Sequence, residues 1–426
     1  MRAQRCKGTR DLSSEEMSRF RLIEGIFRES CLKWGYEEVR TSTIEYLHLF
    51  TATGTLTPNR LRRVYSFLDW DGWSGERVVL RPDGTIPIAR LYIETMTEKE
   101  PAKLFYVTNV FGFEETGKET RERWQCGTEF IGAGSATADV ALVTLALEIM
   151  TKLGLKGTEL KLSHAGLIRT LLAEFGLSHE EQTKAFDQIL DGDLELLARL
   201  KPERPELGRT LATLLDLKGK SAGFLKNMMS LFNRDLPELK VPFNNFIDIV
   251  ERLEAIDGDY QIDITSGRGF EYYTGLMFQL FIGNEPVGGG GRYDALIPLL
   301  GGQDTPASGF ALYLDRLMTL IKPETLAQLR PTEEKILVKG ELERANALKD
   351  ILGLTNRLHG AGYTADVHLG GKEPANIRWR VEIQSKEPRY MLTDRISQQK
   401  FEVATETEVL ASLNINRKKR SPSTTK

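Results

Sequence analysis

A helix-rich stretch interrupts a strand-rich region of this chain and so limits the folds available to it. Residues 177–257 are rich in Leu, Glu, Lys and Asp and carry almost no strand signal. Strand patterns occur at 36–40, 78–81, 104–111, 124–132, 261–265 and 272–282. Because strands before and after the stretch can share one sheet, the order predicts a single α+β core, residues 1–322, with a helical insertion at about 177–257.

Helical periodicity predicts the helices around this sheet. Ser13 and Glu16 have the spacing of a capping box, and apolar residues then recur at helical spacing, which predicts a helix over 14–34. Further helices are expected at about 137–153 and 309–320.

The chain beyond Pro323 has the pattern of a separate unit. The stretch from Pro323 to Pro331 is typical of a linker. Residues 332–412 are predicted to form a small C-terminal α/β domain, with a strand near Trp379. Residues 413–426 are predicted to be a disordered basic tail.

Composition excludes several classes of protein. The chain has 57 Lys and Arg against 60 Asp and Glu, so its net charge of −3 gives no overall attraction to a polyanion. Its 3 cysteines form no CxxC and its 5 histidines no HxH or HxxxH, so we expect no disulfide scaffold, metal or other cofactor. A polar N-terminus and the absence of a long apolar run predict a cytoplasmic protein without a membrane span.

Six short segments of distinctive composition lie between residues 7 and 316. They are KGTRD at 7–11, LRPDGT at 80–85, QCGTE at 125–129, RGFEYYTG at 268–275, GGGRYD at 289–294 and GFALYLDR at 309–316. In this order they resemble the signature segments of histidyl-tRNA synthetases, a group of class II aminoacyl-tRNA synthetases. The resemblance implies an antiparallel sheet of six or seven strands flanked by helices, and dimerisation through the first motif.

The resemblance also implies a histidine pocket. The residues that match family positions holding histidine are Asp83, Gln125, Glu129, Arg268 and Tyr273, and the neighbouring Tyr272 can also pack on the ring. The chemistry agrees, because carboxylates suit an ammonium group or a ring N–H, while Arg268 offers a fork for a carboxylate. Asp83 stands where the family usually has Glu, so its side chain is one methylene shorter.

The segments that would bind ATP depart from the family pattern. Gly112 stands where an arginine would contact the α-phosphate, and Arg123 aligns with the phenylalanine that stacks on adenine. Tyr313 replaces a small residue beside the nucleotide, although Arg316, the arginine of motif 3, is retained. The resemblance therefore implies an intact histidine side and a degraded ATP site.

The C-terminal domain is a poor match to an anticodon-binding domain. Residues 352–367 faintly resemble the family's helix-and-turn pattern, but 377–383 do not match its closing helices. Between residues 331 and 416 there are 12 Lys and Arg against 13 Asp and Glu, so phosphate neutralisation is weak and tRNA is not an expected partner.

Three functions compete. The first is that of a paralogous family, the regulatory subunits of short-form ATP phosphoribosyltransferase, which opens histidine biosynthesis. That resemblance implies no catalytic residues, histidine as effector, a homodimer through the core, and a hetero-octamer with the catalytic subunit, although that family often lacks a C-terminal domain. The second is an active histidine–tRNA ligase with divergent motifs. The third is a synthetase-like protein that joins an amino acid to another acceptor.

Overall fold

The chain folds into two compact units, residues 1–329 and 330–426, which are described separately. The computed structural model describes residues 3–53, 61–69, 75–99, 101–113, 120–190, 205–232, 236–266, 272–329, 335–341, 347–374 and 376–418. The division falls inside the predicted linker. Helix α14 (Pro323–Leu329) closes the first unit.

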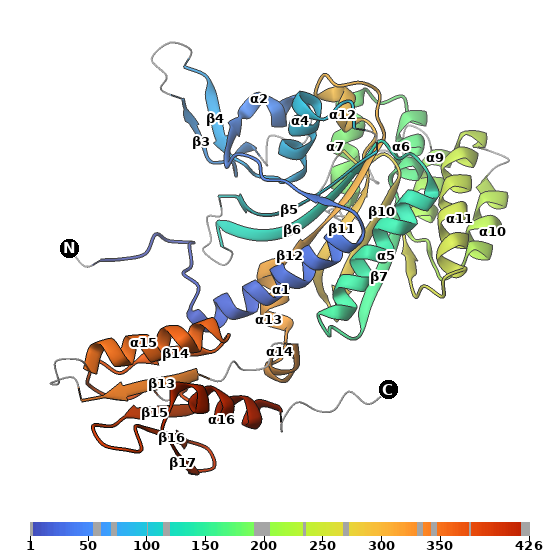
Figure 1. Ribbon diagram of the computed structural model, residues 1–426. Coiled ribbons are helices and arrows are strands. Elements are labelled where there is room, and N and C mark those ends of the chain that lie inside the picture. Colours follow the sequence, from blue (N-terminus) through green and yellow to red (C-terminus); the bar gives the residue numbers. More distant parts are fainter. Residues whose placement is uncertain are drawn as a thin grey trace. The chain divides into compact units, whose positions relative to one another are not determined.

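A nine-stranded sheet forms the centre of the described part of the first unit (Figure 1), where six or seven strands were expected. Its strands, in spatial order, are β1 (Glu37–Glu38), β5 (Ala102–Phe111), β6 (Glu122–Ile131), β12 (Ala307–Tyr313), β11 (Glu285–Arg292), β10 (Leu276–Ile282), β7 (Thr158–His164), β9 (Gln261–Asp263) and β8 (Lys218–Gly219). The run from β5 to β7 is antiparallel, whereas β1–β5 and β7–β9 are parallel pairs. The short outer strands account for the larger strand count.

Helices cover one face of this sheet. In Figure 1, α1 (Ser14–Lys33) and α5 (Ala136–Lys152) cross it, and these two helices also pack on each other. On α1, Phe20 and Phe27 make edge-on contacts with Trp124 of β6 and Phe105 of β5. The predicted capping box at Ser13 and Glu16 starts α1. The candidate site described below lies on the opposite face of the sheet.

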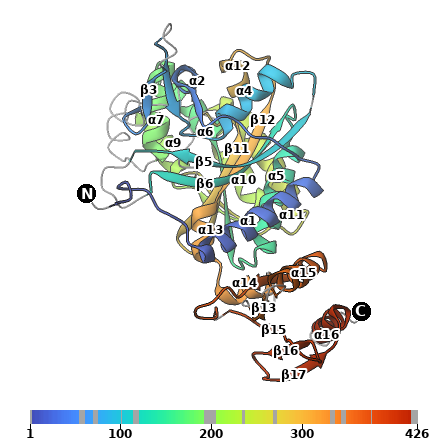
Figure 2. The same cartoon turned by 60° about the vertical axis from the view of Figure 1, so that its left-hand side comes forward.

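The described residues of the predicted insertion are mainly helical, and they also supply the two-residue edge strand β8. The insertion contains α7 (His179–Leu190), α9 (Pro205–Leu215), α10 (Ala222–Phe232), a short 3₁₀ turn (Pro237–Leu239) and α11 (Lys240–Glu254). Helix α6 (Ala165–Glu174) precedes them and leads directly out of β7. Figure 2 shows the same helices from a second side. Phe186, Phe243 and Phe246 are fully buried, so the insertion shares the main core.

A small three-stranded sheet lies beside the central one. Its strands are β2 (Ile44–Tyr46), β4 (Arg77–Leu80) and β3 (Ser66–Leu68), with β4 in the middle. Three helices accompany it, namely α2 (Leu47–Ala52), α4 (Thr85–Thr95) and α12 (Leu296–Leu299). The turn between β4 and α4 carries the LRPDGT segment and delivers Asp83.

The helix predicted over 309–320 is wrong in its first half. Residues Ala307–Tyr313 form strand β12, and the helix, α13 (Leu314–Leu320), begins after it. Strand β12 lies between β6 and β11, and its residues from Ala307 to Leu312 are all buried. A strand covered on both faces has no polar alternation, so its apolar run cannot be distinguished from a helix by periodicity.

The second unit is a small α/β fold, as predicted. Its strands, in spatial order, are β14 (Thr364–Val367), β13 (Lys335–Gly340), β15 (Trp379–Ile383), β16 (Tyr390–Asp394) and β17 (Lys400–Val403). Helices α15 (Ala347–Gly360) and α16 (Glu406–Lys418) complete it. Trp379 is 2% exposed in β15, which confirms the predicted core strand. Helix α16 includes residues 413–418 of the predicted tail, and 419–426 lie outside the described residues.

Candidate functional site

The candidate site lies on the sheet face opposite α1. Along β6, Gln125, Gly127 and Glu129 point to this face, because successive strand residues alternate between faces. Their partners across β12 are Tyr313, Ala311 and Gly309, respectively. The register therefore pairs one predicted histidine-side residue, Gln125, with one predicted ATP-side residue, Tyr313.

Glu129 is almost fully enclosed by the protein. It is 1% exposed, and its carboxyl accepts hydrogen bonds from the hydroxyls of Tyr106, at 3.2 Å, and Tyr293. Burial raises the pKa of Glu129 to about 8, and the nearby Asp83 carboxylate contributes to the rise, although neighbouring hydroxyls oppose it. Without a ligand, this acid is therefore largely protonated near neutral pH.

Three strand glycines give the site its shape. A Cβ at Gly309 would lie 1.9 Å from Oε2 of Glu129, and one at Gly127 would lie 2.3 Å from Cζ of Tyr106. A Cβ at Gly291 would lie 2.9 Å from Cε1 of Tyr273. Without side chains at these positions, the acid and the two rings can lie close against the main chain of neighbouring strands.

Asp83 enters the site from the turn before α4. Its Oδ1 accepts a hydrogen bond from the Ile86 amide at 2.8 Å, in the first turn of the helix. Its Oδ2 is 3.5 Å from the Tyr272 hydroxyl, which donates to it. The neighbouring Arg81 is buried and donates to the main-chain oxygens of Ser42 and Asn109, both at 2.8 Å. Arg81 thus fixes the turn, whereas Asp83 faces the site.

Buried tyrosines form the wall of the site. The ring centroid of Tyr272 lies 5.5 Å from that of Tyr273 and 5.4 Å from that of Tyr293. Burial raises the pKa of each of these phenols well above its ordinary value. They therefore remain neutral and can donate hydrogen bonds to a ligand or to the two carboxyl groups.

The structure brings together most of the predicted histidine-side residues. Asp83, Glu129, Tyr272 and Tyr273 cluster as described, and Nε2 of Gln125 is 3.5 Å from the Tyr106 hydroxyl beside Glu129. Arg268 lies outside the described residues. Two carboxyl groups and several hydroxyls make a site suited to a small cationic group.

Sequence reasoning missed Tyr106 and Tyr293 as members of the site. Tyr106 lies in a strand that was predicted, opposite Gly127 of β6, and alternation from that glycine was the available signal. Tyr293 lies within GGGRYD, next to Arg292, which forms a buried ion pair with Asp139 at 2.7 Å. That segment served only as a family marker.

The residues predicted for the degraded ATP site lie where β5 and β12 end and β6 begins, with Arg316 on α13. The Arg316 guanidinium lies 5.4 Å from the ring centroid of Tyr313, and its Nη1 donates to the Pro286 oxygen at 2.7 Å. Burial raises the pKa of Tyr313, although the charges of Arg316 and Arg123 oppose the rise. A Cβ at Gly112 would meet only Nη2 of Arg123, at 3.5 Å. Arg316 is therefore already engaged with an aromatic ring of this chain.

Known proteins with similar sequences identify the family. A family model described as histidyl-tRNA synthetase matches residues 8–317. An ATP phosphoribosyltransferase regulatory subunit of Dehalococcoides mccartyi strain BAV1 is 52% identical over 410 residues, which cover 96% of this chain and 98% of that protein. The chain belongs to the ATP phosphoribosyltransferase regulatory subunit family. This family therefore shares the histidyl-tRNA synthetase fold, as the six segments indicated.

Synthetases themselves are more distant. A histidine–tRNA ligase of Methanocaldococcus jannaschii is 32% identical over 381 residues, covering 87% of each chain. A solved structure described as an ATP phosphoribosyltransferase regulatory subunit/histidyl-tRNA synthetase from Bacillus halodurans has a TM-score of 0.73 at 22% identity, covering 87% of this chain and 94% of that one. Histidyl-tRNA synthetase from Nostoc gives 0.72 at 19% identity, covering 97% and 99%. These structures confirm the class II fold.

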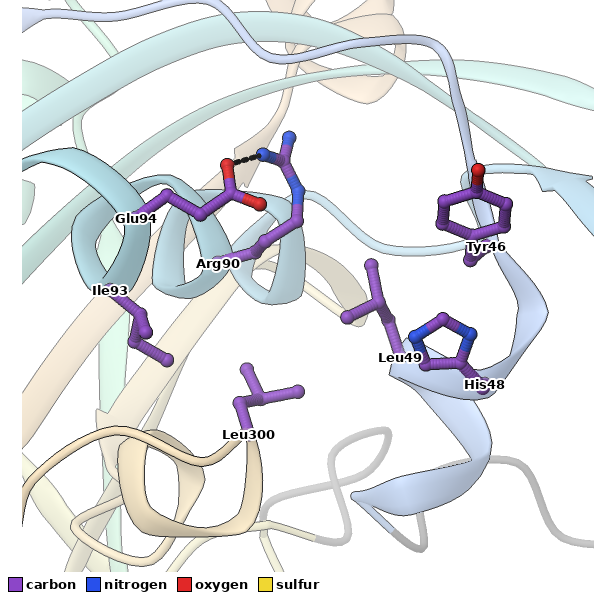
Figure 3. Close-up of a pocket in the computed structure, with 7 residues that line it drawn as sticks. All are labelled: Tyr46, His48, Leu49, Arg90, Ile93, Glu94 and Leu300. Carbon is purple, nitrogen blue, oxygen red and sulfur yellow. Dashed lines mark hydrogen bonds and ion pairs between the residues drawn. The ribbon is translucent and has the colours of Figure 1, made fainter.

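A second hollow, of about 210 Å³, lies away from the site residues (Figure 3). Arg90 of α4 lines it and is bonded to Glu94 at 2.5 Å and to the buried Glu45 at 2.8 Å. The rings of Tyr46 and His48 stack 5.4 Å apart at its side. Leu49, Ile93 and Leu300 supply apolar lining. Its position beside β2 places it next to exposed apolar residues of the small sheet.

The described residues offer neither a membrane span nor a metal site. In the ranges that the structure describes, no helix combines the length and the apolar character needed to cross a bilayer. The same ranges hold no group of three or more His, Cys, Asp or Glu side chains arranged for a metal ion.

Proposed function

We propose that this chain is a non-catalytic, histidine-binding regulatory subunit of ATP phosphoribosyltransferase. The contrast between the two halves of its site carries the proposal. The buried acid, its tyrosines and Asp83 form a hydrogen-bonded cluster, whereas on the nucleotide side Tyr313 packs under Arg316. The relatives that are 52% identical are named as regulatory subunits, which supports the same role here.

Histidine suits the assembled half of the site. In this proposal, Glu129 and Asp83 bind the ammonium group and a ring N–H, and Gln125 supplies a neutral polar contact. Tyr272 and Tyr273 pack on the imidazole ring. Arg268, from the resemblance, takes the ligand carboxylate. The site therefore binds the end product of the pathway without changing it.

The nucleotide half argues against ligation. Activating an amino acid with ATP develops charge on the α-phosphate, and one well-placed donor to such a charge is worth about 3–4 kcal/mol. Gly112 supplies no such donor. Because Arg316 is occupied by Tyr313, an adenine would also have to displace that contact.

The alternative is an active histidine–tRNA ligase. It is favoured by the 32% identity to a named ligase and by the retained Gln125, Glu129 and Arg316. Any synthetase-like transfer to another acceptor requires the same ATP chemistry. One experiment therefore separates regulation from both alternatives.

That experiment measures histidine-dependent exchange of pyrophosphate into ATP alongside histidine binding by calorimetry. We expect binding of one histidine per chain and exchange no greater than in a protein-free control. An active histidyl-tRNA synthetase assayed in parallel shows that the conditions support exchange. Exchange at a rate near that of the synthetase would replace the regulatory proposal with the ligase one, and a lack of histidine binding would refute the pocket assignment.

Regulation further requires partners. We propose that the chain forms a homodimer through its core and assembles with the catalytic subunit into a hetero-octamer. Histidine can act on that complex only by binding two of its states with different affinities. For the homodimer, Ile44, Tyr46 and Phe67 point to one face of the small sheet and are 48%, 43% and 42% exposed. Such an apolar face favours burial against a second copy.

A further inference from the structure

The segment that carries Tyr272 and Tyr273 is held mainly by its main chain. The Thr274 amide donates to the Arg292 oxygen at 2.8 Å, and the Ala165 amide, at the start of α6, donates to the Gly275 oxygen at 2.8 Å. One long side chain also reaches this segment. Nε of Arg169, one turn further along α6, donates to the Tyr273 oxygen at 2.8 Å.

Arg169 makes a second contact on the opposite side. Its guanidinium carbon lies 4.6 Å from the ring centroid of Phe186, which is fully buried on α7 of the helical insertion. A planar guanidinium that stacks on a fixed ring loses rotational freedom, so its N–H groups keep one direction. The position of α7 therefore determines where Arg169 holds the Tyr273 carbonyl.

Small shifts of that carbonyl matter because Tyr273 fits closely. Its ring lies so near the Gly291 main chain that a Cβ there would be 2.9 Å from Cε1. The same ring packs against Tyr272, whose hydroxyl donates to Asp83. A displacement of the carbonyl would move both tyrosines relative to the two carboxyl groups.

We propose that Arg169 is a positioning residue that couples the helical insertion, through Phe186 on α7, to the tyrosine wall of the ligand site. It touches no ligand itself. The effect of Arg169 on ligand affinity rests on the histidine binding proposed above. Its effect on the position of the tyrosine segment does not, because that can be measured without a ligand. By reciprocity, a partner that displaces α7 changes the affinity for ligand by the same factor that the ligand changes the affinity for that partner.

Hydrogen exchange of the ligand-free protein tests the positioning directly. In Arg169→Met, peptides covering 272–276 should exchange about tenfold faster, since a charge-assisted bond to the segment is lost, while β5 and β6 keep their protection. Arg169→Lys keeps a hydrogen-bond donor but loses the planar group that packs on Phe186, so its exchange rate at 272–276 should lie between those of the wild type and Arg169→Met. Arg252→Met serves as the matched control, because Arg252 is a half-exposed arginine of the insertion paired with Asp248.

Calorimetry then tests the coupling. Arg169→Met should bind histidine about tenfold more weakly, Phe186→Leu should weaken binding less, and the double variant should be no weaker than Arg169→Met alone. Unchanged exchange at 272–276 in Arg169→Met, faster exchange throughout the core, or additive effects in the double variant would each overturn the proposal. If Arg169→Met exchanges faster at 272–276 but the wild-type protein binds no histidine, the positioning role would be upheld and the proposed ligand rejected.

Discussion

At the scale of single residues, Glu129 has the environment with the largest chemical effect. Its carboxyl is enclosed by tyrosines and lies near a second acid, Asp83, so the proton is held more tightly than in water. A cation placed beside it favours the ionised form and lowers its pKa again. Binding of a positively charged ligand and loss of this proton are therefore linked.

Histidine binding should consequently release protons. Since the free site has a pKa of about 8, Glu129 is protonated below that pH, and the bound ammonium group, which is already charged in free histidine, ionises it. We expect release approaching one proton per site near neutral pH, and less release above pH 8. Calorimetry in two buffers of different ionisation enthalpy measures the number.

Glu129→Gln provides the control for this release. The amide keeps the shape of the side chain but has no proton to lose, so binding should become weaker and independent of the buffer. Equal proton release in the wild type and in Glu129→Gln would assign the titration to another group.

At the scale of elements, the strand glycines have a different role from glycine in a helix. Gly309 of β12 faces Glu129 of β6 across the ladder, and an added Cβ has no room there. Gly25, in the middle of α1, is exposed and has nothing within 4 Å of an added Cβ. The same chemical change should therefore have opposite effects at these two positions.

We expect Gly309→Ala to destabilise the protein by about 1–3 kcal/mol and to abolish histidine binding, because the carboxyl must move. Gly25→Ala should stabilise it by up to about 1 kcal/mol, since alanine is the better helix former, and should leave binding unchanged. Urea unfolding and calorimetry check both variants. Histidine binding retained at full affinity in Gly309→Ala would show that this close approach does not shape the pocket.

The sequence predicted the helices α1 and α5 and the strands β4, β5 and β6, but it predicted no strand at β7 or β11 and took part of β12 for a helix. The helix at 14–33 has a capping box and a regular apolar period, whereas β12 is apolar on both faces and carries no period. Among site residues, those inside distinctive segments were found. Tyr106 was missed because its role depends on a glycine of the neighbouring strand, a relation that only the register of the sheet reveals.

At the scale of the whole molecule, the proposed dimer would form through the small sheet. The face of the nine-stranded sheet that carries the ligand site would then lie outside the dimer interface. Tyr46 lies both on the exposed apolar face and beside the hollow of Figure 3, so a second copy packed there would also border that hollow.

The exposed apolar face gives a direct test of oligomeric state. Tyr46→Asp combined with Phe67→Asp should convert the dimer to a monomer, because two charges would be buried at the interface. Leu369→Asp is the control, since Leu369 is 72% exposed in the second unit. Light scattering after size-exclusion chromatography measures the mass. A double variant that remains dimeric would place the interface elsewhere.

The glycines beneath the site also limit how this pocket can be redesigned. Gly127, Gly291 and Gly309 have no side chain, so every substitution there adds atoms next to the site. Changes at these positions can therefore only reduce the space for a ligand. Extra room can come only from its walls, by shortening Tyr106, Tyr272, Tyr273 or Tyr293. Each such truncation also removes a phenol from the surroundings of the two acids. A variant that accepts a bulkier amino acid would therefore recognise charge less strictly, so that size and charge selectivity cannot be tuned independently.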